Sequence, residues 1–322
     1  MKIALLGAAG FVGRAAAVEL SRRPEVGEII LVDYIIRDAK KMAKALSPKC
    51  RYAMADVGKA PELVRLLEGI DAVVNAVGPC AEYEKPVLLA CASMRTAAAS
   101  IGDGTLPQED RNEIHAAFRS SGTAAVSGCG MMPGWTDLLA AHFLGGGAAP
   151  DAPPPGLSRY LFFSPDRFGG YSFLRDFAKR TGGEAKAPPG APSGRYFAMS
   201  DGTMVGVPGK KAGARLGPIV NTLGKLGPVG REFAAAMLLW LRGSMAGPPG
   251  TPAAVCGVSD GKRTARVEDP EGKITGILLA EAAVRLGSRS PRPNGLVPIH
   301  ELIGREAARA IATDAGATIT TG

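Results

Sequence analysis

The sequence opens with MKIALLGAAGFVG (residues 1–13), a short apolar run followed by three glycines at three-residue spacing. The apolar run is typical of a buried parallel strand, and the Ala-rich residues 14–20 predict a helix. A strand, a glycine turn and a helix in this order form the dinucleotide-phosphate site of a Rossmann unit. Gly7 would permit the tight turn, Gly10 the approach of a pyrophosphate, and Gly13 the packing of helix on strand. The phosphates would lie at the helix N-terminus, where N–H groups and the helix dipole favour anions.

Strands and helices continue to alternate after this stretch. Apolar runs predict strands at residues 28–32, 51–55, 71–77, 96–100 and 123–127. This alternation indicates a doubly wound α/β fold with a parallel sheet. An ordinary strand–helix turn would also fit three glycines. The place of this triplet, between the first strand and the first helix, favours the dinucleotide site.

Asp33 lies 20 residues after Gly13, where a Rossmann unit carries the acidic residue that accepts hydrogen bonds from the adenosine ribose. A carboxylate at this place repels a 2′-phosphate, which favours NAD over NADP. Arg37, Lys40 and Lys41 follow closely and would bind that phosphate if the loop turned them inward. Alternatively, Asp33 caps the turn after its strand. We therefore expect NAD or NADP as the cofactor, with NAD favoured.

The carboxyl ends of other strands complete the predicted cofactor site. Asn75 is a polar residue inside an apolar strand, and the carboxyl end of that strand faces the cofactor in a Rossmann sheet. An Asn satisfied by backbone groups is the alternative. The residues predicted to bind the cofactor are Gly7, Ala9, Gly10, Phe11, Val12, Gly13, Asp33, Asp56, Asn75, Ala76, Val77, Gly78 and Pro79.

The composition shifts at Gly145, where a Gly/Ala/Pro-rich connection begins. Beyond it, strand-like segments are joined by Asp201-Gly202 and Asp260-Gly261, which are hairpin signals. These segments predict an inserted α+β domain built on a largely antiparallel sheet. The expected domains are a Rossmann domain (1–128), a central domain (129–286), and a segment (287–322) that packs back onto the first domain.

The composition also argues against several classes of protein. Hydrophobic residues make up 46% of the 322 residues and charged residues 21%, as in a globular protein. Five scattered cysteines without a CxxC pair predict reduced thiols in a cytoplasmic protein, and three histidines leave little room for a metal site. We find no signal-peptide pattern. The longest apolar run, 233–241, is about half as long as a bilayer span, so no transmembrane segment is expected.

The net charge is +8, and basic residues concentrate between Lys210 and Arg242. The stretch has no interleaved aromatic residues and no recognition-helix pattern. We therefore expect a solvated face or a field for an anionic substrate, and no nucleic acid. The predicted helix Glu232–Leu241 is interpreted as buried or dimer-facing, with contact to a membrane surface as the alternative.

Several stretches together resemble the saccharopine dehydrogenase-like NAD(P)-dependent oxidoreductase family. The resemblance covers most of the chain and is carried by residues 7–13, 72–79, 86–91, Asp103, 128–139, 258–262, 275–276 and 295–298. It implies an NAD(P)-binding Rossmann domain, a central domain with substrate and homodimer contacts, and a C-terminal helix that returns to the first domain. It also implies hydride transfer at a C–N bond between an amino acid and a carbonyl partner. The Gly/Pro-rich middle region lacks a basic-aromatic substrate signature, so the substrate does not carry over.

Hydride transfer needs the cofactor and substrate held in place, and a proton donor or acceptor assists it. The polar candidates near the predicted crevice loops are Asp103, Asp137, Lys85, Tyr83 and Cys129, of which we predict Asp103 and Asp137 as catalytic. Asp137 follows a Gly/Pro-rich loop that starts at Gly128, and as an alternative it caps the next helix.

Two competing interpretations concern the class of protein. A short-chain dehydrogenase or nucleotide-sugar epimerase needs a tyrosine with a lysine four residues later. None of the six tyrosines has one, which disfavours this class. A non-catalytic sensor or scaffold that binds a dinucleotide remains an alternative to the enzyme, which would act on a small-molecule substrate.

Overall fold

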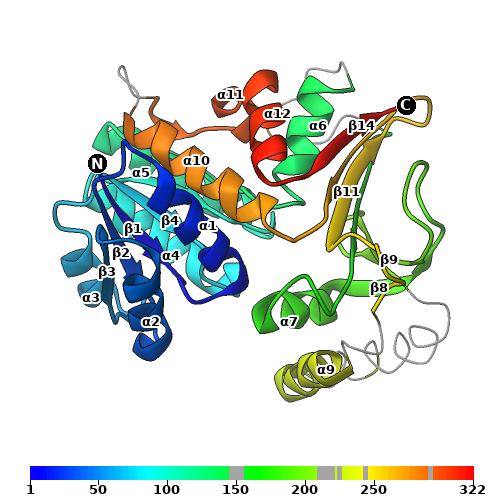
Figure 1. The fold of residues 1–322 in the computed structure, drawn as a ribbon, viewed down its shortest axis with the longest axis horizontal. Coiled ribbons are helices and arrows are strands. Elements are labelled where there is room, and N and C mark those ends of the chain that lie inside the picture. The colour runs from blue at the N-terminus through cyan, green and yellow to red at the C-terminus, as the bar shows by residue number, and fades with distance from the viewer. Residues whose placement is uncertain (145–155, 209–221, 223–226, 242–245, 289–292) are drawn as a thin grey trace. The chain divides into compact units, whose positions relative to one another are not determined.

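The computed structural model describes residues 1–144, 156–208, 222, 227–241, 246–288 and 293–322, which form two units (Figure 1). The first unit comprises Met1–Gly134 and Lys273–Gly304, and the second comprises Trp135–Gly272 and Arg305–Gly322. The connection predicted after Gly145 and most of the basic residues between Lys210 and Arg242 lie outside the described residues.

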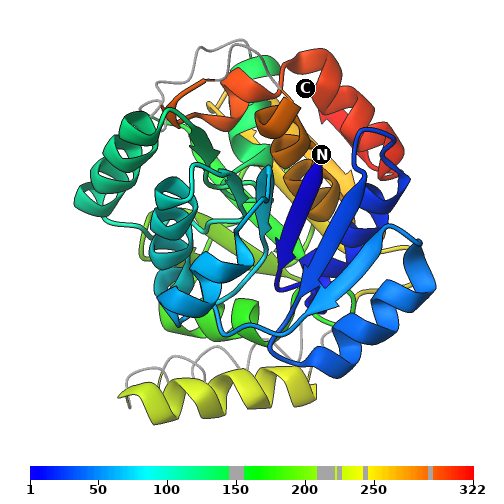
Figure 2. The ribbon, with the colours of Figure 1, turned by 90° about the vertical axis from the view of Figure 1, so that its left-hand side faces the viewer.

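The sheet of the first unit is entirely parallel in its described strands, in the order β13-β6-β5-β4-β1-β2-β3 (Figure 2). Its strands are β1 Lys2–Leu6, β2 Glu28–Val32, β3 Cys50–Ala53, β4 Ala72–Asn75, β5 Ala97–Ser100, β6 Ala124–Val126 and β13 Gly295–Leu296. Six of them follow the Rossmann order, with the reversal between β1 and β4, where ligands bind at the carboxyl ends of the strands. The predicted doubly wound fold is confirmed, with β13 added at one edge.

The helices of the first unit follow the strands in alternation. They are α1 Phe11–Arg22, α2 Ile36–Leu46, α3 Ala60–Leu66, α4 Cys80–Ser93, α5 Gln108–Ser121, α10 Ile274–Ser288 and α11 Ile299–Leu302. The apolar runs identified in the sequence are the core: every residue of β4 and β5 is buried. Cys91 is packed in this core, and burial raises the pKa of its thiol to about 12. All five cysteines are free.

Helix α10 belongs to the first unit, which corrects the expected boundary at residue 286. It lies along α1 (Figure 1), and a Cβ atom on Gly276 would come within 2.5 Å of Ala15 Cβ and 2.7 Å of Ala16 N. Only a glycine permits this approach. The apolar residues of α10, such as Leu278 and Leu279, are fully buried. The helix joins this unit because both its close contacts and its apolar burial lie there.

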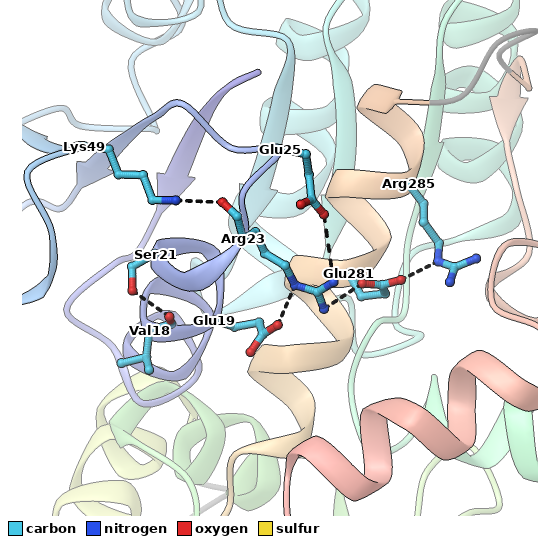
Figure 3. Close-up of polar contacts among 8 residues, drawn as sticks. All are labelled: Val18, Glu19, Ser21, Arg23, Glu25, Lys49, Glu281 and Arg285. Carbon is cyan, nitrogen blue, oxygen red and sulfur yellow. Dashed lines mark hydrogen bonds and ion pairs between the residues drawn. The ribbon is translucent and has the colours of Figure 1, made fainter.

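An ionic network links the C-terminal end of α1 to α10 (Figure 3). The Arg23 guanidinium lies 2.8 Å from Glu281 Oε2 on α10 and 2.6 Å from Glu19 Oε1 on α1. Arg285 lies 2.6 Å from the other oxygen of Glu281. These carboxylates hold the pKa of Arg23 above its usual value, against the effect of its partial burial.

The second unit contains a mixed sheet in the order β14-β12-β11-β7-β10-β9-β8. Its strands are β7 Ser158–Phe163, β8 Thr181–Ala185, β9 Arg195–Met199, β10 Met204–Val207, β11 Ala254–Ser259, β12 Thr264–Asp269 and β14 Thr318–Thr321. Neighbouring strands pair antiparallel except β7 and β10, so the predicted largely antiparallel sheet is confirmed. Its helices are α6 Trp135–His142, α7 Tyr171–Arg180, α9 Gly227–Leu241 and α12 Arg305–Asp314.

The chain end corrects a second expectation. Helix α12 and strand β14 lie in the second unit, so the C-terminal helix does not return to the first one. The reason is that β14 pairs with β12 from Glu268↔Thr318 to Ala265↔Thr321. Among the described residues of the expected returning segment, those up to Gly304 belong to the first unit, with β13 pairing beside β6.

Helix α9 carries large apolar side chains on its surface. Phe233 is 62% exposed and Trp240 83% exposed in the single chain, which contradicts the buried interpretation for these two side chains, and the dimer-facing interpretation stays a prediction. None of the helices in the described part of the chain is long and apolar enough to cross a membrane.

Candidate functional site

The glycine turn has the geometry that its spacing predicts. Gly7 has a φ of +73°, which favours glycine, and its N–H donates to Val32 O (2.9 Å) at the end of β2. Gly10 is the N-cap of α1, with no side-chain cap and no acidic residue in the first turn. The positive end of the helix dipole is therefore not neutralised by a side chain of the helix itself. An anion bound at this end of the helix would be stabilised by the dipole and by the free N–H groups of the first turn.

The three glycines differ in what surrounds them. A Cβ atom on Gly13 would lie 2.9 Å from Ala8 Cα and closer still to Gly7 O, so helix α1 packs directly on the turn. On Gly10 the nearest atom would be Gly7 O at 3.2 Å. Gly7 itself faces the turn after β4, since its Cβ would lie 2.8 Å from Ala76 O. The structure thus brings together the glycine turn and the end of β4, two segments predicted to form one site.

The Asp33 carboxylate joins β2 to the glycine turn. Its Oδ2 accepts a hydrogen bond from Ala9 N (2.8 Å), and its Oδ1 accepts one from Ile35 N (3.0 Å). The second contact is the turn cap considered as an alternative, and the first places the carboxylate beside the turn. Each carboxylate oxygen has a further lone pair for a ligand hydroxyl.

Two of the nearby cations have other partners. The Arg37 side chain is 86% exposed and lies 3.2 Å from Asp38. The Lys40 ammonium lies over the ring of Tyr52, 5.7 Å from its centroid. Asp56 makes a turn of its own, because its Oδ1 accepts from Gly58 N at 3.0 Å.

Asn75, at the end of β4, is completely buried and bonded on both sides. Its Nδ2 donates to Ser100 Oγ (3.1 Å) and its Oδ1 accepts from Val77 N (3.2 Å). The first bond links the ends of β4 and β5, and the second shapes the turn that continues to Pro79. The predicted need of Asn75 for a partner is therefore met by Ser100 together with a backbone group.

Sequence analysis missed Glu84, which lies on α4 and is 1% exposed. Its Oε1 accepts a hydrogen bond from Ser127 Oγ (2.7 Å), and the Ser100 hydroxyl acts to lower the pKa of the carboxyl group. A signal was present, because Glu84 precedes Val87, Leu88 and Cys91 at the spacing of one helix face. In the structure α4 begins at Cys80, with Pro86 inside it.

The two predicted catalytic carboxylates lie in different units. Asp103 follows β5, and its Oδ1 accepts bonds from the backbone N–H (3.1 Å) and hydroxyl of Thr105. Asp137 lies in the first turn of α6, 2.6 Å from Arg159 of β7.

The other candidates are less suited to proton transfer. Lys85 lies 2.6 Å from both Asp110 and Glu113, which raises the pKa of its ammonium. Burial raises the pKa of the Cys129 thiol. Both groups therefore hold their protons near neutral pH. No cluster of metal-ligating side chains occurs among the residues that the structure describes.

Comparison with known proteins agrees with this geometry. Residues 3–126 match the family described as the saccharopine dehydrogenase NADP binding domain. The fold matches saccharopine dehydrogenase (L-Glu forming) from Saccharomyces cerevisiae with a TM-score of 0.63 and 12% identity, over 100% of this chain and 99% of that one. No curated protein matches the chain in sequence.

Partial matches are weaker. Serine dehydrogenase from Escherichia coli (12% identity) and triphenylmethane reductase from Citrobacter sp., complexed with NADP(H) (17%), each match 39% of this chain at a TM-score of 0.32. The matches cover 80% and 48% of those chains, respectively.

The first unit is therefore a dinucleotide-binding domain of the Rossmann class, and its match to the NADP binding domain supports an NAD(P)-dependent oxidoreductase. More particularly, the chain has the fold of saccharopine dehydrogenase, and its resemblance to the saccharopine dehydrogenase-like family is confirmed.

Proposed function

We propose that the protein transfers a hydride between NAD(P) and a small substrate of amino-acid type, at a C–N bond (an imine or a secondary amine) or at a carbonyl group. One observation carries most of the weight: the glycine turn at the start of α1, with the Asp33 carboxylate held beside it by Ala9 N. The end-to-end likeness to the saccharopine dehydrogenase fold favours C–N chemistry. The second unit would hold the substrate and form a homodimer.

The cofactor supplies the hydride chemistry, and the chain binds and orients it. In our proposal the pyrophosphate lies across Gly10 at the N-terminus of α1. The nicotinamide half lies against the turn from Asn75 to Pro79. The adenosine ribose hydroxyls bond to the free lone pairs of Asp33. A fixed position for the ring relative to the substrate is the main contribution such a site makes to the rate.

Cofactor preference follows from the same carboxylate. The negative charge of Asp33 beside the ribose repels a 2′-phosphate, and Arg37 has a partner in Asp38, so we propose NAD. The matching family is described as an NADP binding domain, so a measured preference for NADH or NADPH would decide between the two cofactors.

For the proton that accompanies hydride transfer we propose Asp103. It lies in the loop after β5, at the edge of the sheet where the Rossmann class binds its ligands. It would take or give the proton at the substrate nitrogen or oxygen. Asp137 is the second candidate, and its carboxylate lies 2.6 Å from the Arg159 guanidinium.

Fluorescence titration with NADH and NADPH tests the proposal. We expect saturable binding, lost in Gly10→Glu, because the new side chain would occupy the place of the pyrophosphate. Asp33→Ser should weaken NADH by about tenfold relative to NADPH, the equivalent of 1.4 kcal/mol. Glu68→Gln, an exposed carboxylate in the same unit, is the matched control and should change neither.

The outcomes separate the alternatives. If neither cofactor binds at millimolar concentration, the oxidoreductase proposal fails. If a cofactor binds but mixtures of amino acids and 2-oxo acids give no turnover, the sensor or scaffold interpretation replaces it.

A further inference from the structure

Glu84 lies where three strand ends of the first unit meet. Ser127, directly after β6, donates to its Oε1 at 2.7 Å. The hydroxyl of Ser100, the last residue of β5, acts to lower the pKa of the same carboxyl group, and it accepts a hydrogen bond from Asn75 Nδ2 at the end of β4. Asn75 in turn accepts from Val77 N. The buried carboxyl group and these three hydrogen bonds therefore lie at the turns that follow β4, β5 and β6.

The carboxyl group is held closely in this place. Gly102, in the loop after β5, has a φ of +42°, and a Cβ atom on it would lie 2.7 Å from Glu84 Oε1. The same Cβ would lie 2.5 Å from Ser127 Oγ and 2.6 Å from Gly128 N. The backbone of this loop thus covers the carboxyl group directly. A shift of the Glu84 side chain would displace the loops on both sides.

The surroundings favour the neutral form of the group. Burial raises the pKa of Glu84, and the negative charge of Asp103 acts in the same direction. The hydrogen bonds from Ser127 and Ser100 and the more distant charge of Arg111 act against it. Glu84 Oε2 is buried and has no hydrogen-bond partner among the described residues. An ionised carboxylate with one unpaired oxygen would be costly here.

We propose that Glu84 is a positioning residue for the nicotinamide half of the site, holding the turns after β4, β5 and β6 in the arrangement that receives the ring. This inference rests on the proposed function, because it needs a dinucleotide bound along these turns. Glu84 does not touch the ligand. It acts through Ser100 on Asn75 and through Ser127 on the loop that begins at Gly128.

The effect should be confined to one end of the cofactor. The adenosine end is formed by the glycine turn and Asp33, which are bonded to each other and have no hydrogen bond to Glu84 in the described structure. Loosening the three turns therefore changes the nicotinamide subsite alone. A purely structural role would alter both ends or neither.

Calorimetric titration with two ligands separates these cases. NADH carries the nicotinamide ring, whereas ADP-ribose has the adenosine and pyrophosphate but no nicotinamide. If the wild type binds NADPH more tightly than NADH, NADPH and 2′-phospho-ADP-ribose take the place of these two ligands. Glu84→Ala should weaken NADH by about tenfold, since it removes the Ser127 hydrogen bond and the interaction with the Ser100 hydroxyl, and should leave ADP-ribose within about twofold. The fluorescence of bound NADH should shift towards that of the free form.

Glu84→Gln is the conservative variant. Its amide oxygen can accept the same hydrogen bond from Ser127, so NADH affinity should remain within about threefold of the wild type. Ser127→Ala removes the hydrogen bond to Glu84 Oε1 but leaves Ser100 in place, so it should give an intermediate loss, and it serves as the test if Glu84→Ala does not fold. Glu109→Ala, an exposed carboxylate on α5, is the control and should change neither ligand.

Three results are decisive. Equal losses of NADH and ADP-ribose in Glu84→Ala, or no loss of either, would overturn the positioning role. Failure of Glu84→Gln to restore NADH affinity would also overturn it. If the wild type binds NADH no more tightly than ADP-ribose, the nicotinamide subsite is absent and the proposed function fails, whatever Glu84 does.

Discussion

Alanine substitutions at Gly10 and Gly13 should separate ligand binding from packing, although the two glycines lie in the same turn. At Gly13 the new Cβ would meet Ala8 Cα at 2.9 Å and Gly7 O still closer. These are backbone atoms, which cannot move aside as the end of a side chain can. Overpacking of this kind costs about 1–3 kcal/mol, and we take the upper end. Alanine recovers up to about 1 kcal/mol of helix propensity, which leaves a net loss of about 2 kcal/mol.

At Gly10 the contact is milder, because the nearest atom to the new Cβ is Gly7 O at 3.2 Å. Its backbone, with φ of −68° and ψ of 169°, is accessible to alanine. The loss of stability should stay near 1 kcal/mol, as for other N-cap changes to alanine. The methyl group would, however, stand between the turn and a pyrophosphate. We expect NADH to bind at least about tenfold more weakly.

The assay pairs thermal unfolding with cofactor titration. Gly13→Ala should lower the melting temperature by about 4–8 °C, at about 2–4 °C per kcal/mol for a domain of this size. Gly10→Ala should lower it by half as much or less. Gly27→Ala is the matched control: its Cβ would lie 3.8 Å from Met1 O, an ordinary contact, so stability should change by less than about 0.5 kcal/mol.

Two results would refute this reasoning. If Gly13→Ala is as stable as Gly27→Ala, helix α1 does not pack directly on the glycine turn. If Gly10→Ala binds NADH as the wild type does, the pyrophosphate does not cross Gly10.

Two further predictions concern stability. At pH values below about 4, the Glu84 carboxyl group is mostly protonated in both the folded and the unfolded state. Above the pKa of the unfolded state, about 4.3, the unfolded chain loses this proton, whereas burial keeps it on the folded protein. The free energy of unfolding of the wild type therefore falls as the pH rises. Glu84→Gln cannot titrate, so its stability relative to the wild type should rise from pH 4 to pH 8 in urea unfolding; a constant difference would contradict a raised pKa. Arg23→Ala leaves Glu19 and Glu281 without their shared cation and should cost about 1–2 kcal/mol, less than a fully buried pair because Arg23 is partly exposed. In a double-mutant cycle with Glu281→Ala the losses should not add, and additive losses would show that the pair is not coupled.

Features carried by short-range spacing were determined by the sequence alone. The glycine triplet, the alternation of apolar runs with helices, and Asp33 at its distance from Gly13 were enough to predict the Rossmann sheet. These signals arise from the periodicity of strands and helices and from the steric needs of one turn, all within a few tens of residues. The hairpin signal at Asp260-Gly261 determined the β11–β12 pair for the same reason.

Tertiary structure alone decided which distant segments meet. Helix α10 packs in the first unit because Gly276 permits a close approach to Ala15. The end of the chain lies in the second unit because β14 pairs with β12. The sequence also could not predict the partners of Glu84, because Ser127 lies 43 residues further along the chain. A pattern can mark a carboxylate on an apolar face. Only the packing of three strand ends determines what that carboxylate holds in place.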